Sequence, residues 1–396
     1  MNILVLNCGS SSVKFQLIKM QDESILAKGM VEEIGQPQSR VTYQIGSHEE
    51  IEMQESIEHH KDALHRVIEL LLTPENGVIR DTSEISGVGH RVVHGGATFT
   101  ESVEITEHVK EDIRACIPLS PLHNPANLTG IEVAETVLPG VPQVAVFDTS
   151  HGTSLPASAY TYAIPQTWRD TYNIRRYGFH GTSHAFVGRQ AATELQKPYE
   201  TLRIITCHLG NGASMSAIHY GTCVETSMGF TPLEGLVMGS RSGDIDPAII
   251  PFIREHETLE LSDIDSQLNT QSGMLALTGD TDMRIIEKRA REGSEREKLA
   301  LEVYCHRIRK YLGAYTFVMG GVDVIVFTAG IGEHSAYVRE HVLRGLEELG
   351  IILNPDANER DATRIGKGRV DILIIPTNEE LAIARDTHDI LLQIPR

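Results

Sequence analysis

Two widely separated stretches of the chain share one pattern of apolar and polar positions. In residues 2–15 and again in residues 203–216, an apolar run leads through a glycine-bearing turn into a segment where apolar residues alternate with polar ones. The alternating apolar positions are Val13, Phe15 and Leu17 in the first stretch, and Ala213, Met215 and Ala217 in the second. Such alternation beyond a tight turn predicts an antiparallel β-hairpin in each stretch.

The turns of both hairpins suit anion binding. Gly9, Gly210 and Gly212 allow the backbone to turn where a Cβ atom would clash, and such turns leave N–H groups free to point at an anion. One hairpin of this kind would be weak evidence for a phosphate-binding site. Its repetition predicts two similar domains that hold a phosphate-bearing ligand from opposite sides.

The remaining pattern alternates between helical and extended periods, which predicts an α/β protein. Residues up to about 55 are polar after the first hairpin, and Thr182 or Ser183 is the expected N-cap of a helix that begins near residue 183. Asn378 is the expected cap of a C-terminal helix. Further helices are predicted over 60–72, over an amphipathic segment near 107–117 and up to Gly320, and further strands over 87–93, 143–147, 322–327 and 372–375.

The length of 396 residues favours two domains over one. The expected division is an N-terminal ribonuclease H-like domain over 1–150, joined by the C-terminal helix 378–396, and a nucleotide-binding domain of the same kind over 151–377. A content of 41% hydrophobic and 22% charged residues is typical of a globular enzyme. The net charge of −19 argues against a nucleic-acid or anionic-membrane surface, so an anionic substrate would be held by a few local cations.

Cysteine usage and the N-terminal pattern predict a cytoplasmic protein. The five cysteines show no CxxC pair, which fits reduced thiols rather than a disulfide framework or a metal site. No basic region precedes the first strand and no apolar run reaches the length of a bilayer, so neither secretion nor membrane insertion is expected.

Three cationic residues stand where a ligand could approach. Arg91 follows an apolar strand and precedes two glycines, and Arg241 lies in a loop of Gly and Ser residues. A guanidinium fork binds phosphate or carboxylate with two hydrogen bonds. A surface salt bridge is the more common role of an isolated arginine, but the flanking Gly and Ser residues here would let a ligand approach. His180 stands just before a helix start, where developing negative charge is favoured; a purely structural histidine is the alternative.

Three acidic or amide side chains also have two interpretations each. Asp148 follows the strand 143–147 directly, a position typical of catalytic residues, but also of turn caps. Glu379 opens the last helix, where the helix dipole alone would favour a carboxylate. Asn7 ends the first strand, either as a ligand of hydrated Mg²⁺ or phosphate or as the start of an Asx-turn.

Several familiar motifs are absent from the sequence. There is no GxxxxGK[ST] P-loop and no GxSxG nucleophile elbow, and Gly330-Ile331-Gly332 lacks the third glycine of a dinucleotide fingerprint. His59, His60 and His65 have helical spacing on a polar face, which indicates solvent exposure rather than a metal cluster.

The remaining motifs resemble the acetokinase family of acetate and propionate kinases, in family order over nearly the whole chain. They are 7–14 (NCGSSSVK), 89–96 (GHRVVHGG), 121–125 (PLHNP), 177–184 (YGFHGTSH), 208–212 (HLGNG), 238–247 (MGSRSGDIDP), 282–284 (DMR), 330–333 (GIGE) and 376–380 (PTNEE). The resemblance implies the two-domain fold of the actin, Hsp70 and sugar-kinase superfamily, with duplicated mixed sheets. It also implies reversible Mg²⁺-dependent phosphoryl transfer from ATP to acetate, with Mn²⁺ as a possible substitute, by a homodimer.

The resemblance also implies a role for each matching residue. Catalysis would involve Arg91, Asp148, His180 and Arg241, and Mg²⁺ would be positioned by Asn7 and Glu379. Acetate would contact Arg91, Val93, Leu122, His123, Phe179 and Pro232. The nucleotide would contact Lys14, His208, Leu209, Gly210, Asn211, Gly212, Asp282, Met283, Arg284, Gly330, Ile331, Gly332, Glu333 and His334. Because a carboxylate nucleophile is already ionised above pH ~4, Asp148 is expected to orient acetate or the metal rather than to act as a base.

The chain departs from the family pattern at His151-Gly152, after Asp148, and at Glu225 and His334. Val93 leaves little room for a longer acyl chain, which favours acetate, with propionate as a poor substrate because one methylene is worth only about 1–3 kcal/mol. A propionate or butyrate kinase and a non-transferring conformational ATPase are the alternatives. Three cations facing a carboxylate pocket would serve no purpose in a pure nucleotide switch.

Overall fold

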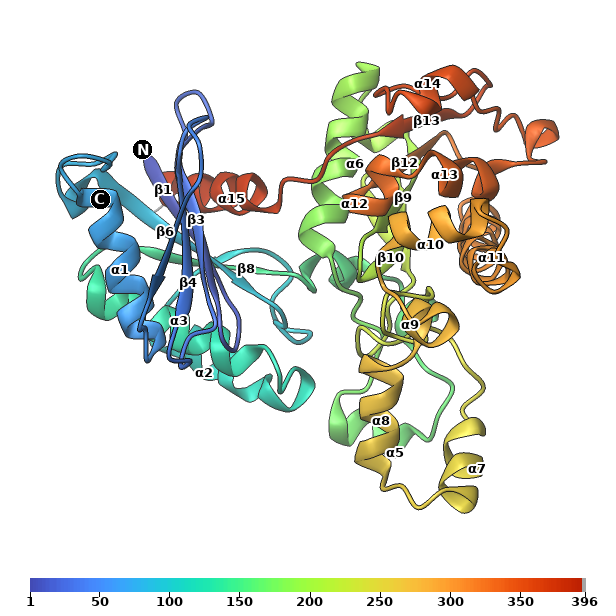
Figure 1. Cartoon of the computed structure of the whole chain (residues 1–396), viewed down its shortest axis with the longest axis horizontal. Helices are drawn as coiled ribbons and strands as arrows, with labels where there is room; N and C mark the ends of the chain where they lie inside the picture. Colours follow the sequence, from blue (N-terminus) through green and yellow to red (C-terminus); the bar gives the residue numbers. More distant parts are fainter. Residues whose placement is uncertain (394–396) are drawn as a thin grey trace. The chain divides into compact units, whose positions relative to one another are not determined.

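The computed structural model describes residues 1–393, which form two compact units (Figure 1). The first unit consists of residues 1–153 together with the chain from residue 378 onward, and the second consists of residues 154–377. The sequence analysis placed the corresponding boundaries at 150/151 and 377/378. The chain therefore leaves the first unit once and returns to it for the last helix.

An eight-stranded mixed sheet forms the centre of the first unit, in the order β5-β4-β3-β2-β1-β6-β8-β7. The pairs β1–β6 and β6–β8 are parallel and the other pairs are antiparallel. The strands are β1 (Asn2–Cys8), β2 (Val13–Lys19), β3 (Ser24–Glu32), β4 (Ser39–Ile45), β5 (Ile51–Glu55), β6 (Ile85–Val92), β7 (Val103–Glu104) and β8 (Gln143–Phe147). The segment up to residue 55, which the sequence suggested only as polar, forms β3, β4 and β5. Ala27 and Val31 of β3 and Val41 and Tyr43 of β4 are buried, whereas β5 at the edge of the sheet has no buried residue.

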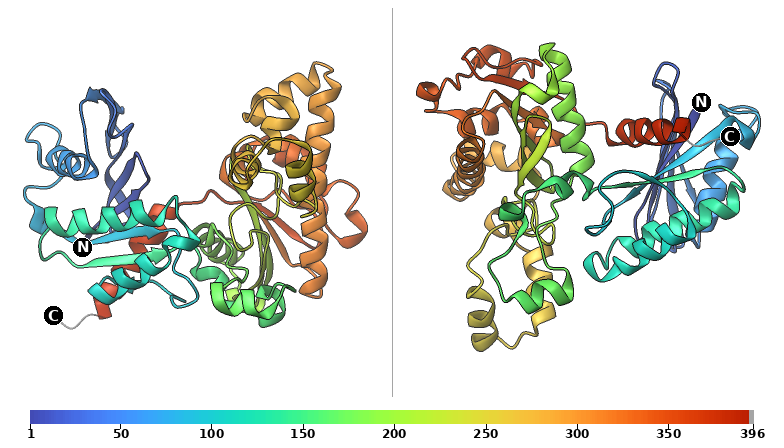
Figure 2. Two further views of the ribbon diagram at one scale, coloured as in Figure 1. Left: turned by 90° about the horizontal axis from the view of Figure 1, so that it is seen from below. Right: turned by 180° about the vertical axis from the view of Figure 1, so that it is seen from behind.

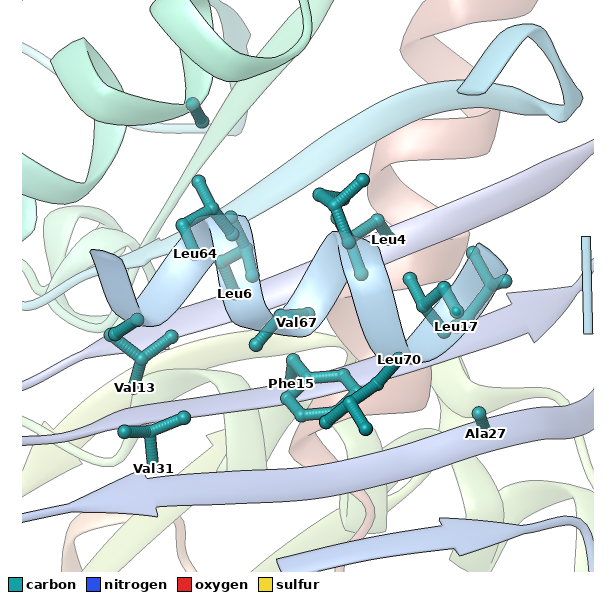
Figure 3. Close-up of a cluster of buried hydrophobic side chains, with 14 of the residues drawn as sticks. Leu4, Leu6, Val13, Phe15, Leu17, Ala27, Val31, Leu64, Val67 and Leu70 are labelled. Atoms are coloured by element: carbon teal, nitrogen blue, oxygen red, sulfur yellow. The ribbon is translucent and has the colours of Figure 1, made fainter. Parts of the chain in front are cut away.

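Helices cover both faces of this sheet. On one face, α1 (His60–Leu72) and α3 (Asn124–Val137) bury Leu4 and Leu6 of β1, as Figure 3 shows for α1. On the other face, α15 (Glu379–Gln393) covers Ile3 and Val5. Both faces of β1 are thus buried, which explains its unbroken apolar run. α2 (Glu107–Ala115) packs beside α3 and buries Ile113 against Phe147.

The contact between α15 and β6 depends on two glycines. A Cβ atom added at Gly89 would collide with Thr387 and would lie 2.7 Å from Cγ2 of Ile383, both on α15. A Cβ atom at Gly87 would collide with Leu391. The glycines therefore allow α15, drawn in red among the blue and cyan strands in Figure 2, to lie directly on the backbone of β6.

The second unit contains a five-stranded mixed sheet in the order β11-β10-β9-β12-β13. Its strands are β9 (Arg203–Leu209), β10 (Ala213–His219), β11 (Thr222–Thr226), β12 (Val324–Thr328) and β13 (Asp371–Ile374). The pairs β9–β12 and β12–β13 are parallel, and β10 pairs antiparallel with β9 and β11. The strands β3-β2-β1-β6-β8 of the first unit have the same order and directions, so the predicted duplicated α/β fold is confirmed.

Both predicted hairpins are present, with turns of different length. Cys8 pairs with Val13 across the turn 9–12, whereas Leu209 pairs with Ala213 across the shorter turn 210–212. As a result Asn7 lies opposite Lys14 in the first hairpin, and His208 lies opposite Ser214 in the second.

The second unit also contains eleven α-helices in residues 154–377. They are α4 (Ala157–Tyr160), α5 (Gln166–Tyr172), α6 (Gly181–Leu195), α7 (Ile249–His256), α8 (Leu261–Thr270), α9 (Gly273–Thr278), α10 (Met283–Arg291), α11 (Glu295–Val318), α12 (Ala329–His334), α13 (Ala336–Leu343) and α14 (Pro355–Glu359). Of these, α6, α11 and α12 contact the sheet. The predicted cap of α6 is wrong. The helix begins at Gly181 after His180, whose φ of 55° lies in the left-handed region.

Other expectations concern cysteines, histidines and membrane segments. All five cysteines are free. His59 and His65 are exposed, whereas His60 is half-buried with its Nε2 atom 2.7 Å from the carbonyl oxygen of Gly9. Within residues 1–393 no three His, Cys, Asp or Glu side chains gather as a metal cluster, and no helix has the length and apolar character needed to cross a membrane.

Burial of His90 on β6 predicts a loss of stability in acid. His90 is 2% exposed, and burial lowers its pKa from 6.5 to about 4, although the hydrogen bond with Gln143 acts in the opposite direction. Below pH 6.5 the His90 side chain binds a proton in the unfolded chain but stays neutral in the folded chain. The free energy of unfolding should therefore fall between about pH 6.5 and 4, by up to about 3 kcal/mol. In denaturant unfolding at several pH values, His90→Gln should lose this part of the pH dependence. Parallel pH profiles for the two proteins would contradict it.

Candidate active site

The carboxyl ends of three adjacent parallel strands place the sequence-predicted residues of the first unit on one edge of the sheet. Leu6 of β1 is level with His90 of β6, and Val92 of β6 is level with Phe147 of β8. Asn7, Arg91 and Asp148 lie at these strand ends. The parallel order of β1, β6 and β8 therefore brings together residues that are far apart in the sequence.

Arg91 is the centre of a charged cluster at this edge. One terminal nitrogen of its guanidinium donates to Asp148, and its Nε atom lies 3.8 Å from a carboxylate oxygen of Glu379 in the first turn of α15. Asp148 is 1% exposed. Burial lowers the pKa of Arg91, but the charges of Asp148 and Glu379 outweigh this, and the net pKa is raised. Lys14 forms a neighbouring ion pair with Glu380.

Glu379 lies half-buried beside Asp148, and both conditions disfavour its ionised form. Burial, and then the charge of Asp148, raise its pKa to about 7, against the opposing effect of Arg91. One guanidinium thus does not compensate both carboxylates. A further cation at this edge would stabilise the ionised form of Glu379.

Two asparagines of α3 fix the chain that follows β6, and the sequence analysis missed them. Oδ1 of Asn127 accepts from the N–H of Val93 at 3.0 Å, and its amide donates to the carbonyl of Cys8 at 2.8 Å. Asn124 accepts from the N–H of His94 at 3.1 Å and donates to its carbonyl at 2.9 Å. Both asparagines are buried, so they pin the segment behind Arg91 rather than face a ligand.

The predicted acetate-contacting residues occur in both units. In the first, Val93 is 5% exposed, His123 is half-buried just before α3, and Leu122 is 78% exposed. In the second, Phe179 is 5% exposed and Pro232 is half-buried.

A network of hydroxyl and imidazole groups fixes His180 in the second unit. Nδ1 of His180 lies 2.9 Å from Oγ of Ser214, which also lies 2.7 Å from Nε2 of His184. The His180 ring stacks on that of His208 at 4.2 Å between centroids, and Nδ1 of His208 lies 2.8 Å from Oγ of Ser183. Ser214 and Ser183 were not selected from the sequence. The position of Ser214 opposite His208 in the second hairpin was the signal that could have revealed it.

Arg241 meets His180 at the second glycine turn. A Cβ atom at Gly212 would lie 3.5 Å from the imidazole of His180 and 3.6 Å from a terminal nitrogen of Arg241. Among residues 1–393, no carboxylate lies within 4.0 Å of the Arg241 guanidinium, and burial lowers its pKa. Gly212 therefore lies against an imidazole and a guanidinium and has no side chain that would exclude a ligand.

Two residues of the same turn, Gly210 and Asn211, line a cavity of about 320 Å³. Predicted nucleotide residues that line it are Gly210, Asn211, Asp282, Met283, Arg284, Gly330, Ile331 and His334, and Thr281, Glu287 and Ser335 line it unpredicted. His208, Leu209, Gly212, Gly332 and Glu333 are not among its lining residues, and Lys14 belongs to the first unit.

Glu333 and Asp282 hold parts of the cavity wall in place. Glu333 accepts from the N–H of Ala329 at 2.8 Å and from the N–H of Thr377 at 3.4 Å, so it fixes α12 from within. Asp282 caps α10 by accepting from the N–H of Arg284 at 2.9 Å, and it also pairs with the Arg284 guanidinium at 2.7 Å. These hydrogen bonds lower the pKa of Asp282 to about 2.

The two units offer different chemistry. The first has two carboxylates and a guanidinium at a sheet edge, which suits a divalent cation and a small carboxylate. The second has a cavity that opens beside a glycine turn with His180 and Arg241, which suits a nucleotide whose phosphates reach the turn.

Comparison with known proteins gives close matches over the whole chain. The acetokinase family model matches residues 2–385. The acetate kinase of Thermotoga maritima is 51% identical over 406 positions, covering 100% of both chains, and that of Treponema denticola is 49% identical, covering 98% of this chain and 99% of its own.

Solved structures agree. The acetate kinase of Porphyromonas gingivalis matches with a TM-score of 0.95 at 44% identity, and a propionate kinase of Francisella tularensis with 0.92 at 40% identity. Each match covers 98% of this chain and 99% of the other. The chain therefore belongs to the acetokinase family.

Proposed function

We propose that this protein catalyses the reversible transfer of the γ-phosphoryl group of ATP to acetate, giving acetyl phosphate and ADP. The observation that carries the proposal is the turn 210–212. Gly210 and Asn211 line the cavity proposed for the nucleotide, and Gly212 lies against His180 and Arg241. A phosphate chain that extends from the cavity along this turn would thus reach two groups able to neutralise its charge.

Direct in-line transfer needs little proton chemistry. An acetate oxygen forms the bond to the γ-phosphorus while the bond to the bridging oxygen of ADP breaks, and the acetate is already ionised at neutral pH. We assign His180 and Arg241 to the charge on the transferred group, and Arg91 to the acetate carboxylate. Asp148, which holds one side of the Arg91 guanidinium, orients this cation rather than accepting a proton.

The residues present fit a divalent metal ion, for which Mg²⁺ is our proposal, with Mn²⁺ as a substitute. The carboxylates of Glu379 and Asp148 carry more negative charge than Arg91 compensates, and Mg²⁺ prefers one or two carboxylates together with waters and phosphate oxygens. Glu379 and Asn7 would hold it. When bound, the ion neutralises phosphate charge and aligns the phosphoryl group.

Trapping of the product tests the activity directly. With ATP, Mg²⁺ and acetate, hydroxylamine should convert acetyl phosphate into a coloured hydroxamate in an amount that matches the ADP formed. Omitting acetate should abolish both products. ADP release without hydroxamate would instead identify a conformational ATPase.

A propionate kinase is the second candidate, because the propionate kinase of Francisella tularensis has nearly the same fold. The same assay with acetate, propionate and butyrate decides between them.

We also propose that the enzyme acts as a cytoplasmic homodimer. Large apolar side chains exposed on the second unit, such as Phe252 on α7 and Phe317 on α11, support the assembly.

Val93 should determine acyl-chain length. Val93→Ala removes two methyl groups at the proposed pocket wall, so the ratio of kcat/KM for propionate to that for acetate should rise by about 10-fold or more, given about 1–3 kcal/mol per methylene. Val92→Ala is the matched control, because Val92 packs into the core around Phe147. If both variants leave the ratio unchanged, Val93 does not line the pocket.

A further inference from the structure

The loop that carries Arg241 is closed at its neck by a single aspartate. Asp244 accepts from the N–H of Gly235 at 2.9 Å through Oδ1, and its own N–H donates to the carbonyl of Gly235 at 3.0 Å. Gly235 has a φ of 111°, which an L-residue would rarely adopt. The two ends of the segment 235–244 are thus joined by two hydrogen bonds between Gly235 and Asp244.

Two side chains of α11 tie this neck to the body of the second unit. Arg307 donates to the carbonyl of Gly235 at 2.8 Å and to that of Asp244 at 3.2 Å. The hydroxyl of Tyr311 donates to Oδ2 of Asp244 at 2.9 Å. Because residues 307 and 311 are one helical turn apart, they lie on the same face of the helix and hold both ends of the loop together.

Arg241 itself depends on this loop for its place. Its carbonyl accepts from the N–H of Met238 at 3.1 Å, and Gly239 donates to the carbonyl of Asn211 at 2.8 Å. No carboxylate within residues 1–393 fixes the guanidinium by an ion pair. The side-chain contact that the guanidinium makes within these residues, from a terminal nitrogen to Sδ of Met238 at 3.9 Å, comes from the same loop, so the fold of the loop determines where the guanidinium lies relative to Gly212.

We propose that Asp244, Arg307 and Tyr311 are positioning residues that hold Arg241 at the phosphate turn. This inference rests on the function proposed above, in which Arg241 stabilises the transferred phosphoryl group. A misplacement of about 1 Å in such a group is enough to lower the rate about 100-fold. α11 thus contributes to catalysis without touching the substrate.

Tyr311→Phe is the decisive variant, and Tyr315→Phe is its matched control. Tyr315 lies one turn further along α11, is 1% exposed and stacks edge-on with Tyr311 at 5.6 Å, but its hydroxyl has no hydrogen-bond partner among the described residues. Tyr311→Phe should lower kcat about 10- to 100-fold with unchanged affinity for ADP in the absence of acetate. Tyr315→Phe should retain wild-type kcat.

A double-variant cycle separates positioning from a general structural effect. In the Arg241→Ala background, adding Tyr311→Phe should cause no further loss of kcat, because the group that it positions is absent. Equal losses in both backgrounds would overturn the inference, as would wild-type kcat in Tyr311→Phe. If Tyr311→Phe does not fold, Arg307→Lys, which keeps the charge but not the two-carbonyl contact, takes its place. Absence of hydroxamate from wild type and Tyr315→Phe alike would instead refute the proposed function.

Discussion

Replacing Arg241 by alanine should lower kcat at least about 1000-fold and leave both the melting temperature and the affinity for ADP close to wild type. Removing one cation that acts on the transferred phosphoryl group typically has an effect of this size. No ion pair of Arg241 is described within residues 1–393, so its removal leaves no buried carboxylate uncompensated. Steady-state kinetics, calorimetric titration with ADP and thermal unfolding measure the three quantities.

Arg91→Ala provides the contrast. It should lower turnover to a similar extent but also destabilise the protein, by about 3–5 kcal/mol, because Asp148 is 1% exposed and loses the guanidinium charge beside it. Free guanidinium should restore part of the activity of Arg241→Ala. Normal turnover in either variant would contradict the assigned roles, and an unchanged melting temperature of Arg91→Ala would show that the pair does not stabilise the fold.

The second large effect is expected at Gly89 of β6, where the chain lies directly against α15. Gly89→Ala places a Cβ atom against Thr387 and Ile383, so α15 must shift away from β6. Overpacking of this kind destabilises by about 1–3 kcal/mol. Because Glu379 begins α15, the shift should also weaken the binding of Mg²⁺, so that half-maximal activity requires a higher Mg²⁺ concentration. Denaturant unfolding and a titration of activity with Mg²⁺ test both effects.

Gly313→Ala is the matched control for this variant. Gly313 lies within α11, with no atom within 4 Å of an added Cβ, so alanine there should raise stability by about 0.5–1 kcal/mol through helix propensity. If Gly89→Ala proves as stable as Gly313→Ala, the close approach of α15 to β6 is not needed for the first unit.

Local patterns were sufficient to predict the elements that form the centre of each unit. The alternation after Gly9 and Gly212 identified both hairpins, and the apolar run 143–147 gave β8 within its observed bounds. Asn378 was also correctly identified as the cap of α15, since its side chain accepts from the N–H of Leu381 at 3.0 Å. These signals lie within a few residues of the feature that they predict.

Features fixed by distant partners could not be predicted in this way. Serine is a residue type that often caps helices. The hydroxyl of Ser183, however, forms hydrogen bonds with His208 and Thr377, and α6 begins two residues earlier. Glu333 stands in a motif attributed to nucleotide contact, yet its carboxylate binds backbone N–H groups of Ala329 and Thr377. Both side chains also contact Thr377, which lies 194 residues from Ser183 and 44 residues from Glu333, so no local pattern encodes these contacts.

The return of α15 to the first unit also imposes an order on folding during synthesis. At about 5–20 residues per second, residues 154–377 take roughly 10–45 s to translate after the first unit has left the ribosome. For that time Ile3, Val5, Val144 and Val146 present an apolar sheet face to solvent, because the helix that covers it has not yet been made. The first unit therefore cannot complete its core until the last helix of the chain has been made, although its sheet is synthesised first.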